Sequence, residues 1–380
     1  MNPVVIKKVL PIEVTFLRNR KKFPFPKYKE NPIKDHYEQT FENQKSFGKK
    51  ISNMFEQDNS LYNVLAMAPT QSGKTGSMIA VVYEFFQSHS LRLPKNNVFI
   101  FTGLSSIDWL EQTKKRFPSW LHPHIYHRNN VNTMIEELKR LKNTLIIIDE
   151  CHIAEKETQT LGKLFDECNY KDTNHIYKTN TKIIQFTATP NKLYNRFKEL
   201  KDMGHGIAHM DVPESYLSVD KLKEQNRVYE ALDLCGVMDK DDLTNINKDV
   251  YENIRNLDIH LKQLQPCYHI IRTPRGNLHN IVIQNFKKVF ENENYLYISE
   301  PSMNQGEFDK LLLVSPEKHT FVFIKDKLRC AKTIHHEFVG ILYDRVVQNP
   351  IESSVLQGLL GRLTGYHHNK KAVVYICDKN

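Results

Sequence analysis

The chain has no hydrophobic run long enough to cross a membrane. Its longest uninterrupted apolar stretches span residues 64–68 and 78–83, whereas a membrane-spanning helix needs roughly 18 apolar residues. Near the N-terminus, Lys7, Lys8 and Glu13 interrupt the apolar residues before a hydrophobic signal region forms, and no small-residue cleavage site follows. We therefore expect a soluble, intracellular protein with no membrane partner.

Cysteine is scarce and scattered. The 380 residues include six cysteines and no Cys-x-x-Cys pair, which argues against both a disulfide framework and a structural zinc site. His205 and His209 are four residues apart and Asp211 follows them, so a metal site on a helical face can be imagined. No catalytic Glu accompanies them, and we interpret these histidines as packed or solvated side chains.

Acidic residues are outnumbered by basic ones. The chain has 53 Lys and Arg against 44 Asp and Glu, a net charge of +9, which favours an anionic partner, with nucleic acid ahead of an anionic membrane surface. Residues 1–34 alone carry nine Lys and Arg against two Glu. Their prolines oppose helix formation, so this segment is predicted to be an extended basic arm. A solvated tail without a partner is the alternative.

From Phe41 onward, short β-rich runs alternate with longer helical stretches. This alternation predicts an α/β fold with a mostly parallel sheet covered by helices on both faces. The strand signal disappears between about residues 210 and 265 and then resumes as a second α/β domain. The expected boundaries are 1–36 for the basic N-terminal arm, 37–209 for the first domain, 210–266 for a helical connector or insertion, and 267–380 for the second domain. The predicted strands are 63–68, 97–102, 144–149, 182–186, 268–272, 295–299, 320–324, 338–342 and 372–376, and the clearest predicted helices are 75–87 and 106–117.

A phosphate-binding loop is predicted between the first strand and the following helix. Residues 68–75 read Ala-Pro-Thr-Gln-Ser-Gly-Lys-Thr, with Ala where the general pattern has its first Gly. A strand, a loop and a helix that meet at Gly-Lys-Thr are typical of a site for ATP phosphates. The glycine lets backbone amides approach the phosphates, the lysine neutralises the β and γ oxygens, and the threonine ligates Mg2+. The predicted ATP-binding residues of this loop are Pro69, Thr70, Gln71, Ser72, Gly73, Lys74 and Thr75, the last also a metal ligand.

A pair of carboxylates follows a second buried strand. Residues 145–148 are all Leu or Ile, and Asp149 and Glu150 come directly after them. Ligands of open α/β sheets bind outside the carboxyl ends of the strands. We therefore expect Asp149 to hold Mg2+ and Glu150 to orient or deprotonate the attacking water. Solvated surface carboxylates are the alternative.

Together these residues resemble superfamily-two helicases and translocases. Residues 68–75 look like motif I, Asp149–His152 like the DExH form of motif II, residues 186–190 like motif III and residues 357–366 like motif VI. Finer features around residues 102–112 and 323–333 resemble helicase-like proteins of large DNA viruses and phages, which implies a host cell if the protein is virus-encoded. The resemblance implies two RecA-like domains in tandem, Mg-ATP between them, and nucleic acid as the partner, with DNA favoured over RNA.

The resemblance also assigns roles around the nucleotide. Thr187 and Thr189 would couple hydrolysis to domain movement, and Arg362 would act as an arginine finger from the second domain. Gln44 lies where the family often reads adenine, with a surface helical glutamine as the alternative.

Nucleic-acid contacts are expected at two places. Thr102 and Gly103 would touch the nucleic-acid backbone, as the resemblance implies. Lys325 and Arg329 belong to a basic cluster after a strand of the second domain, where they could grip phosphates, unless this is only a solvated face. Trp109 could stack on a base or be buried between helix and sheet.

Several positions depart from the family pattern. Gly365 occupies the place of the second arginine of motif VI, so Arg362 works alone or with Arg345 or Arg329. In the phosphate loop, Gln71 replaces a common Gly. A Thr-rich motif V is not recognisable between residues 338 and 354.

We expect an ATP-dependent helicase or translocase. A double-strand translocase or annealing ATPase that does not unwind, and a nucleic-acid-binding scaffold with structural ATP and negligible turnover, are the alternatives.

Overall fold

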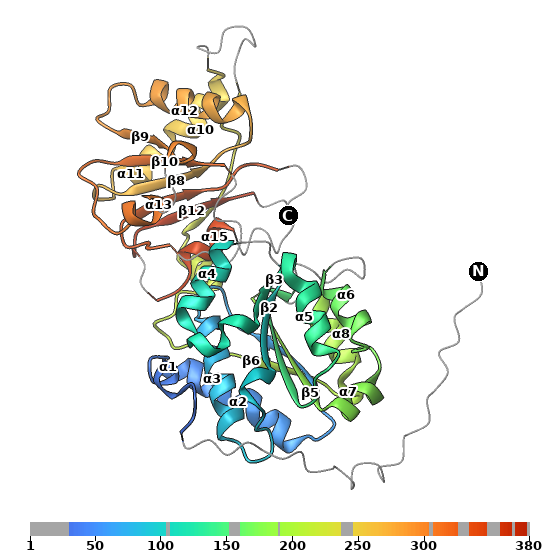
Figure 1. The fold of residues 1–380 in the computed structure, drawn as a ribbon. Coiled ribbons are helices and arrows are strands. Elements are labelled where there is room, and N and C mark those ends of the chain that lie inside the picture. The colour runs from blue at the N-terminus through green and yellow to red at the C-terminus, as the bar shows by residue number, and fades with distance from the viewer. Residues whose placement is uncertain are drawn as a thin grey trace.

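Two parallel β-sheets, each covered by helices on both faces, organise the protein. A computed structural model describes residues 30–103, 107–151, 160–188, 191–236, 246–303, 307–325, 334–347, 358–366 and 369–377. The first sheet lies in the lower half of Figure 1 and the second in the upper half. In these ranges, no helix combines the length and the apolar character that a membrane crossing requires. The two sheets confirm the predicted α/β class.

The first sheet has six parallel strands in the order β3-β2-β4-β5-β1-β6. Buried parallel strands are expected as continuous apolar runs, and β4 is buried along its whole length. The strands are β1 (Asn63–Met67), β2 (Val98–Thr102), β3 (Ile125–His127), β4 (Thr144–Asp149), β5 (Thr181–Thr187) and β6 (His205–His209).

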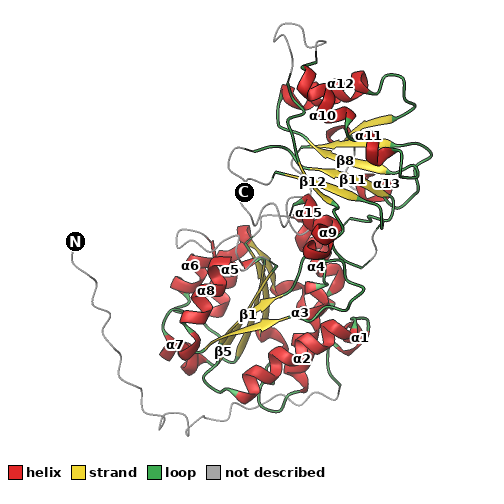
Figure 2. Ribbon diagram, turned by 180° about the vertical axis from the view of Figure 1, so that it is seen from behind, coloured by secondary structure: helices red, strands yellow, loops and turns green. Residues whose placement is uncertain are grey.

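Two layers of helices cover the first sheet, as Figure 2 shows. Alternate strand residues point to opposite faces, so Val64 packs with the first layer and Leu65 with the second. The first layer contains α1 (Lys34–Glu38), α2 (Glu42–Gln57), α3 (Lys74–Gln87) and α4 (Ile107–Arg116). The second contains α5 (Val131–Leu138), α6 (Thr160–Glu167), α7 (Thr173–Thr179) and α8 (Asn191–Glu199).

The second sheet also has six parallel strands, in the order β7-β12-β11-β8-β10-β9. Its strands are β7 (Val228–Glu230), β8 (Tyr268–Arg272), β9 (Leu296–Ser299), β10 (Thr320–Ile324), β11 (Val339–Tyr343) and β12 (Val373–Ile376). One face packs against α9 (Val219–Glu224), α13 (Glu307–Leu311) and α15 (Leu359–Leu363). The other packs against α10 (Lys248–Arg255), α11 (Asp258–Leu261) and α12 (Asn277–Val289).

The segment 210–266, which we expected to be a helical connector or insertion, also contains a strand. It contains α9, α10 and α11, but it also contributes the strand β7, which pairs in parallel with β12 at the edge of the second sheet. His205 and His209 lie on β6, so the helical face imagined for them is wrong.

The described end of the predicted basic arm packs against the first domain. Ile33 is fully buried, the Trp120 indole donates to the Pro32 carbonyl at 3.2 Å, and α1 begins at Lys34. Residues 1–29 lie outside the described part of the chain.

Candidate active site

The loop between β1 and α3 has the geometry of a phosphate cradle. The Ala68 amide donates to the Thr187 carbonyl at 3.0 Å, which ties the start of the loop to the end of β5. Ser72 Oγ donates to the Pro69 carbonyl at 2.7 Å and closes the loop on itself. Gly73 caps α3 with φ 96°, a conformation that favours glycine. The N-terminus of a 14-residue helix is therefore presented at the loop, where backbone amides favour an anion.

Gln44 is held directly against this loop by the packing of α2 on α3. A Cβ on Gly48 would lie 2.6 Å from Ala80 Cβ, so the glycine permits the close contact of the two helices. One turn earlier, Gln44 is buried, and a Cβ on Gly73 would lie only 1.9 Å from its Nε2 atom. Gln44 Oε1 accepts from the Phe41 amide at 3.1 Å. Its side chain is thus fixed beside the phosphate loop.

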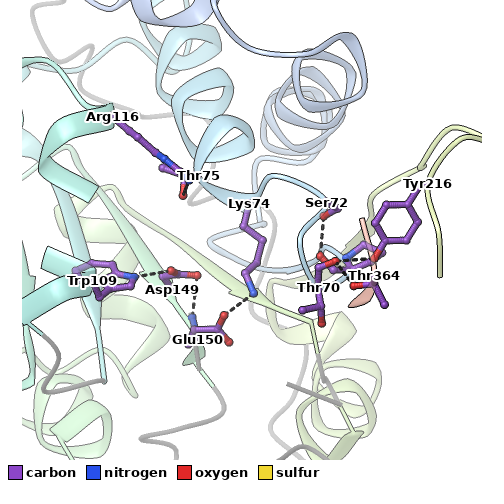
Figure 3. A network of polar contacts seen from close by, with 11 residues as sticks. Thr70, Ser72, Lys74, Thr75, Trp109, Arg116, Asp149, Glu150, Tyr216 and Thr364 are labelled. Carbon is purple, nitrogen blue, oxygen red and sulfur yellow. Dashed lines mark hydrogen bonds and ion pairs between the residues drawn. The ribbon is translucent and has the colours of Figure 1, made fainter. Parts of the chain in front are cut away.

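The carboxylates lie at the carboxyl end of β4. Asp149 Oδ1 accepts from the Glu150 amide at 3.0 Å, and Asp149 Oδ2 accepts from Trp109 Nε1 at 2.9 Å. Lys74 Nζ lies 2.5 Å from Glu150 Oε1. Figure 3 shows this chain of contacts from Trp109 through Asp149 and Glu150 to Lys74. Trp109 is only 6% exposed, and its indole N–H is bonded to the Asp149 carboxylate. Because the ring is buried, the stacking on a base that we considered is wrong.

The electrostatics of this group follow from burial and from the neighbouring charges. Burial and the charge of Glu150 raise the pKa of Asp149 to about 6, although Lys74 and the Trp109 hydrogen bond oppose the rise. Burial lowers the pKa of Lys74, but Glu150 and Asp149 together outweigh burial and leave that pKa above its ordinary value. Lys74 therefore remains a cation among buried carboxylates.

A cavity of about 610 Å³ is lined by these groups and by residues of the second domain. Arg362, from α15, lies on its wall although its own helix packs into the core of the second domain. Arg116, at the end of α4, donates to Thr75 Oγ1 at 3.2 Å. The residues with predicted nucleotide or catalytic roles that line the cavity are Gln44, Thr70, Gln71, Gly73, Lys74, Thr75, Asp149, Glu150 and Arg362.

The cavity wall also suits Mg2+. Thr75 and Asp149 supply oxygen donors, the ligand type that Mg2+ prefers. Two buried carboxylates, Asp149 and Glu150, lie beside the single Lys74 ammonium. Burial, followed by the charge of Glu150, raises the pKa of Asp149, so a further cation would stabilise its ionised form. The residues present therefore fit the ion that the phosphate loop implies.

The other predicted residues are placed as follows. Thr187 is buried at the end of β5, and its carbonyl contacts the loop through Ala68. Thr102 ends β2, Gly103 follows it, and Lys325 follows β10 in the second domain. None of these four lines the cavity, and neither does Arg345, considered as a helper of Arg362. His152, Thr189 and Arg329 lie outside the described residues.

Sequence reasoning missed several residues of the cavity wall. Phe41 is 64% exposed, and its ring centroid lies 6.2 Å from that of Tyr366 of the second domain. Arg116 gave no signal, because it ends a helix amid other basic residues. The available signal for Phe41 was that it is aromatic and lies three positions before Gln44.

The amino-acid sequence resembles that of a viral protein. No protein-family description matches the sequence. The chain is 26% identical over 339 residues to an uncharacterized protein, L594, of Acanthamoeba polyphaga mimivirus, with 83% of this chain and 80% of that protein covered.

Two solved structures resemble it at low sequence identity. The DEAD-box helicase Mss116, bound to ssRNA and UDP-BeF, matches with a TM-score of 0.55 and 12% identity, covering 91% of this chain and 73% of that one. The ATP-dependent Type ISP restriction-modification enzyme LlaBIII, bound to DNA, matches with a TM-score of 0.60 and 14% identity, covering 89% and 28%. The fold is that of two RecA-like domains in tandem.

A third solved structure has a similar fold. Escherichia coli DEAH/RHA helicase HrpB matches with a TM-score of 0.51 and 12% identity, covering 87% of this chain. The chain spans 42% of the length of HrpB. The tandem RecA-like fold accounts for the cavity between the two halves of the molecule, because the phosphate loop and α15 come from different domains and meet there.

Proposed function

We propose that this protein is a nucleic-acid-dependent ATPase that acts as a helicase or translocase. One observation carries the proposal. A single cavity brings together the Lys74 ammonium, the Asp149 and Glu150 carboxylates and, from the other domain, the Arg362 guanidinium. These are the charges that phosphoryl transfer requires: cations for the phosphates, a carboxylate for the metal, and a carboxylate for the attacking water.

The residues divide this chemistry as follows. Thr75 and Asp149 would hold Mg2+, which supplies charge stabilisation when it is bound. Lys74, at the first position of α3, is placed to share its charge between Glu150 and phosphate oxygens. Glu150 would then orient the attacking water and accept its proton. Arg362 would stabilise the charge of the transition state.

The partner and the coupling residues are finer parts of the proposal. LlaBIII is bound to DNA and Mss116 to ssRNA, so both nucleic acids have a precedent among similar folds, and our preference is DNA. Thr102 and Gly103 would contact the strand, as would Lys325 and Arg329. Thr187 and Thr189 would couple hydrolysis to domain movement. The Thr187 carbonyl supports this role through its hydrogen bond to the phosphate loop.

Pre-steady-state phosphate release from Mg-ATP tests the enzymatic claim. We expect continuous turnover for the natural chain and a loss of at least about 100-fold for Lys74→Ala. Arg362→Ala should bind ATP with similar affinity and hydrolyse it about 1000-fold more slowly, as expected for an arginine finger. A burst without steady turnover would instead identify a scaffold with structural ATP, and normal hydrolysis by Arg362→Ala would refute the finger assignment.

Displacement of a labelled strand from a duplex separates the two motor activities. A helicase releases the strand in an ATP-dependent manner, with Lys74→Ala as the inactive control. If ATP is consumed on nucleic acid but no strand is released, the protein is a translocase or annealing ATPase.

A further inference from the structure

Two of the departures from the family pattern lie against each other in space. Gly365 occupies the place of the second motif VI arginine, and Gln71 occupies the place of a phosphate-loop glycine. A Cβ on Gly365 would lie 3.4 Å from Gln71 Cβ. Gly365 also has φ 118°, where any side chain is strained. An arginine at position 365 would therefore have a strained backbone, and its Cβ would contact Gln71, so the two substitutions belong to one local arrangement.

Gln71 joins the phosphate loop to the helix that carries Arg362. Its Nε2 donates to the Gly361 carbonyl at 2.8 Å and to the Arg362 carbonyl at 2.7 Å. These carbonyls lie at the end of the five-residue helix α15, where carbonyls have no partner within the helix. A planar amide with two N–H donors can bond to both of them. Within the second domain, Thr364 Oγ1 also lies 2.8 Å from the Gly361 carbonyl and His336 Nδ1 lies 2.9 Å from the Arg362 carbonyl. The contact spans 290 positions of sequence and crosses from one domain to the other.

Neighbouring contacts fix the same part of the loop. Thr364 Oγ1 donates to the Thr70 carbonyl at 3.0 Å, and the Tyr216 hydroxyl donates to the same carbonyl at 2.6 Å. Figure 3 shows both side chains beside Thr70. Leu217, next to Tyr216, exchanges backbone hydrogen bonds with Gly365 at 2.9 and 3.1 Å. Hydrogen bonds thus connect the phosphate loop to motif VI and to the segment between the two domains.

The backbone of Gln71 points to a role for its side chain. Its φ is 59°, in the left-handed region where glycine is unstrained and other residues are not. A glutamine at this position keeps the strain that the common glycine would relieve. Such strain at a functional site is retained where the side chain contributes to function.

We propose that Gln71 is a positioning residue that forms an interdomain latch with the carbonyls of Gly361 and Arg362 and so holds the Arg362 guanidinium in the cavity. The latch fixes this helix beside the phosphate loop in a chain that lacks the second arginine of motif VI. This inference rests on the proposed function, because it assigns Gln71 an action through the arginine finger. Gln71→Met keeps the side-chain length and removes both donors, whereas Gln71→Gly also relieves the backbone strain.

A double-mutant cycle in ATP hydrolysis tests the inference. We expect kcat to fall about 10- to 100-fold in Gln71→Met and Gln71→Gly, the range for a misplaced catalytic group. The affinity for a non-hydrolysable ATP analogue should change by less than about 3-fold. In an Arg362→Ala background the same changes should lower kcat by less than about 2-fold, because the residue they position is gone. Gln57→Ala, at the exposed end of α2, is the control.

Two kinetic outcomes would overturn the latch. If kcat is unchanged in both variants, Gln71 positions nothing. If kcat falls equally in the presence and absence of Arg362, Gln71 acts on the phosphates and not through the arginine.

Hydrogen–deuterium exchange of the nucleotide-free protein tests the latch separately from activity. Loss of Gln71 should speed exchange in residues 358–366 and leave β1 and β4 as protected as in the natural chain. Unchanged exchange in residues 358–366 would refute the latch. If the natural chain shows no ATP turnover, the proposed function fails, and this exchange measurement still decides whether the latch exists.

Discussion

Backbone strain in this protein is concentrated in the candidate active site. Among the described residues, six non-glycine residues have a positive φ. Four are asparagines, which tolerate this conformation, and the other two are Gln71 and Glu150. Both line the cavity. Strained residues persist where surrounding contacts fix them, and here the fixing contacts are the latch carbonyls for Gln71 and the Lys74 ammonium for Glu150.

Trp109 gives a prediction at the scale of one residue. Its indole N–H supports Asp149 Oδ2, and a hydrogen bond to a charged group contributes about 1.5–3 kcal/mol. Trp109→Phe keeps an aromatic ring but loses this donor, so the Asp149 carboxylate is less well oriented for a cation. We expect the Mg2+ concentration for half-maximal ATP turnover to rise about 10-fold.

Trp120 provides the matched control for that measurement. Its indole donates to the Pro32 carbonyl and does not line the cavity. Trp120→Phe should leave the Mg2+ dependence as it is in the natural chain. An equal shift in both variants, or none in Trp109→Phe, would show that the Asp149 contact has no part in holding the metal.

Residues in local patterns could be predicted from the sequence, and residues defined by domain packing could not. Lys74 follows a strand and a glycine, and Asp149 follows a buried strand, so neighbouring residues specify their positions. The same sequence showed Gln71 and Gly365 only as two unrelated departures. Their contact depends on how the second domain packs on the first, which no local spacing encodes.

Among the elements, the central strands and the edge strand β9 were predictable, and the other edge strands were not. The predicted boundaries of β4, β8 and β10 are confirmed. The unpredicted strands β3, β6 and β7 all lie at sheet edges. A strand buried on both faces reads as a continuous apolar run, whereas an edge strand needs no such run. β3 and β7 have only three residues each, and β6 has a histidine at each end.

The interior strand β8 gives a prediction at the scale of an element. Its fully buried His269 accepts from the Ile341 amide through Nδ1 at 3.2 Å, so the proton resides on Nε2, which donates to His319 Nδ1 at 2.8 Å. Burial, followed by the charge of His319, lowers the pKa of His269 well below its ordinary value of 6.5. The folded state therefore keeps this histidine neutral where the unfolded state binds a proton.

Stability should consequently fall as the pH drops below 6.5. Because the unfolded state binds more protons in this range, each such proton contributes a slope of up to about 1.4 kcal/mol per pH unit. Asn can accept from the Ile341 amide without titrating, so His269→Asn should lose less unfolding free energy than the natural chain between pH 6.5 and pH 5. Denaturant titrations across this range measure the slope. Equal slopes in the two proteins would exclude His269 as the group responsible.

At the scale of the whole molecule, the positive charge lies mainly outside the two RecA-like domains. Residues 1–34 have a net charge of +7, which leaves +2 for the other 346 residues. The charge excess therefore does not identify the ATPase site. It indicates an additional basic segment for phosphate binding.

Deletion of residues 1–29 tests that segment. We expect weaker binding of single-stranded nucleic acid and a shallower dependence of log K on log salt, by about 0.7 for each lost phosphate contact. A full-length variant with the eight Lys and Arg residues of this segment changed to Gln separates charge from chain length. A salt dependence that stays the same in both variants would mean that the segment is a solvated tail.

The most direct test of the central claim is steady-state ATP turnover with and without single-stranded DNA and RNA. Lys74→Ala defines the background rate. If two RecA-like domains close on ATP when they bind a strand, at least one nucleic acid should stimulate turnover several-fold, and Lys74→Ala should abolish that stimulation. Turnover that neither DNA nor RNA stimulates would contradict the assignment of a nucleic-acid-dependent motor.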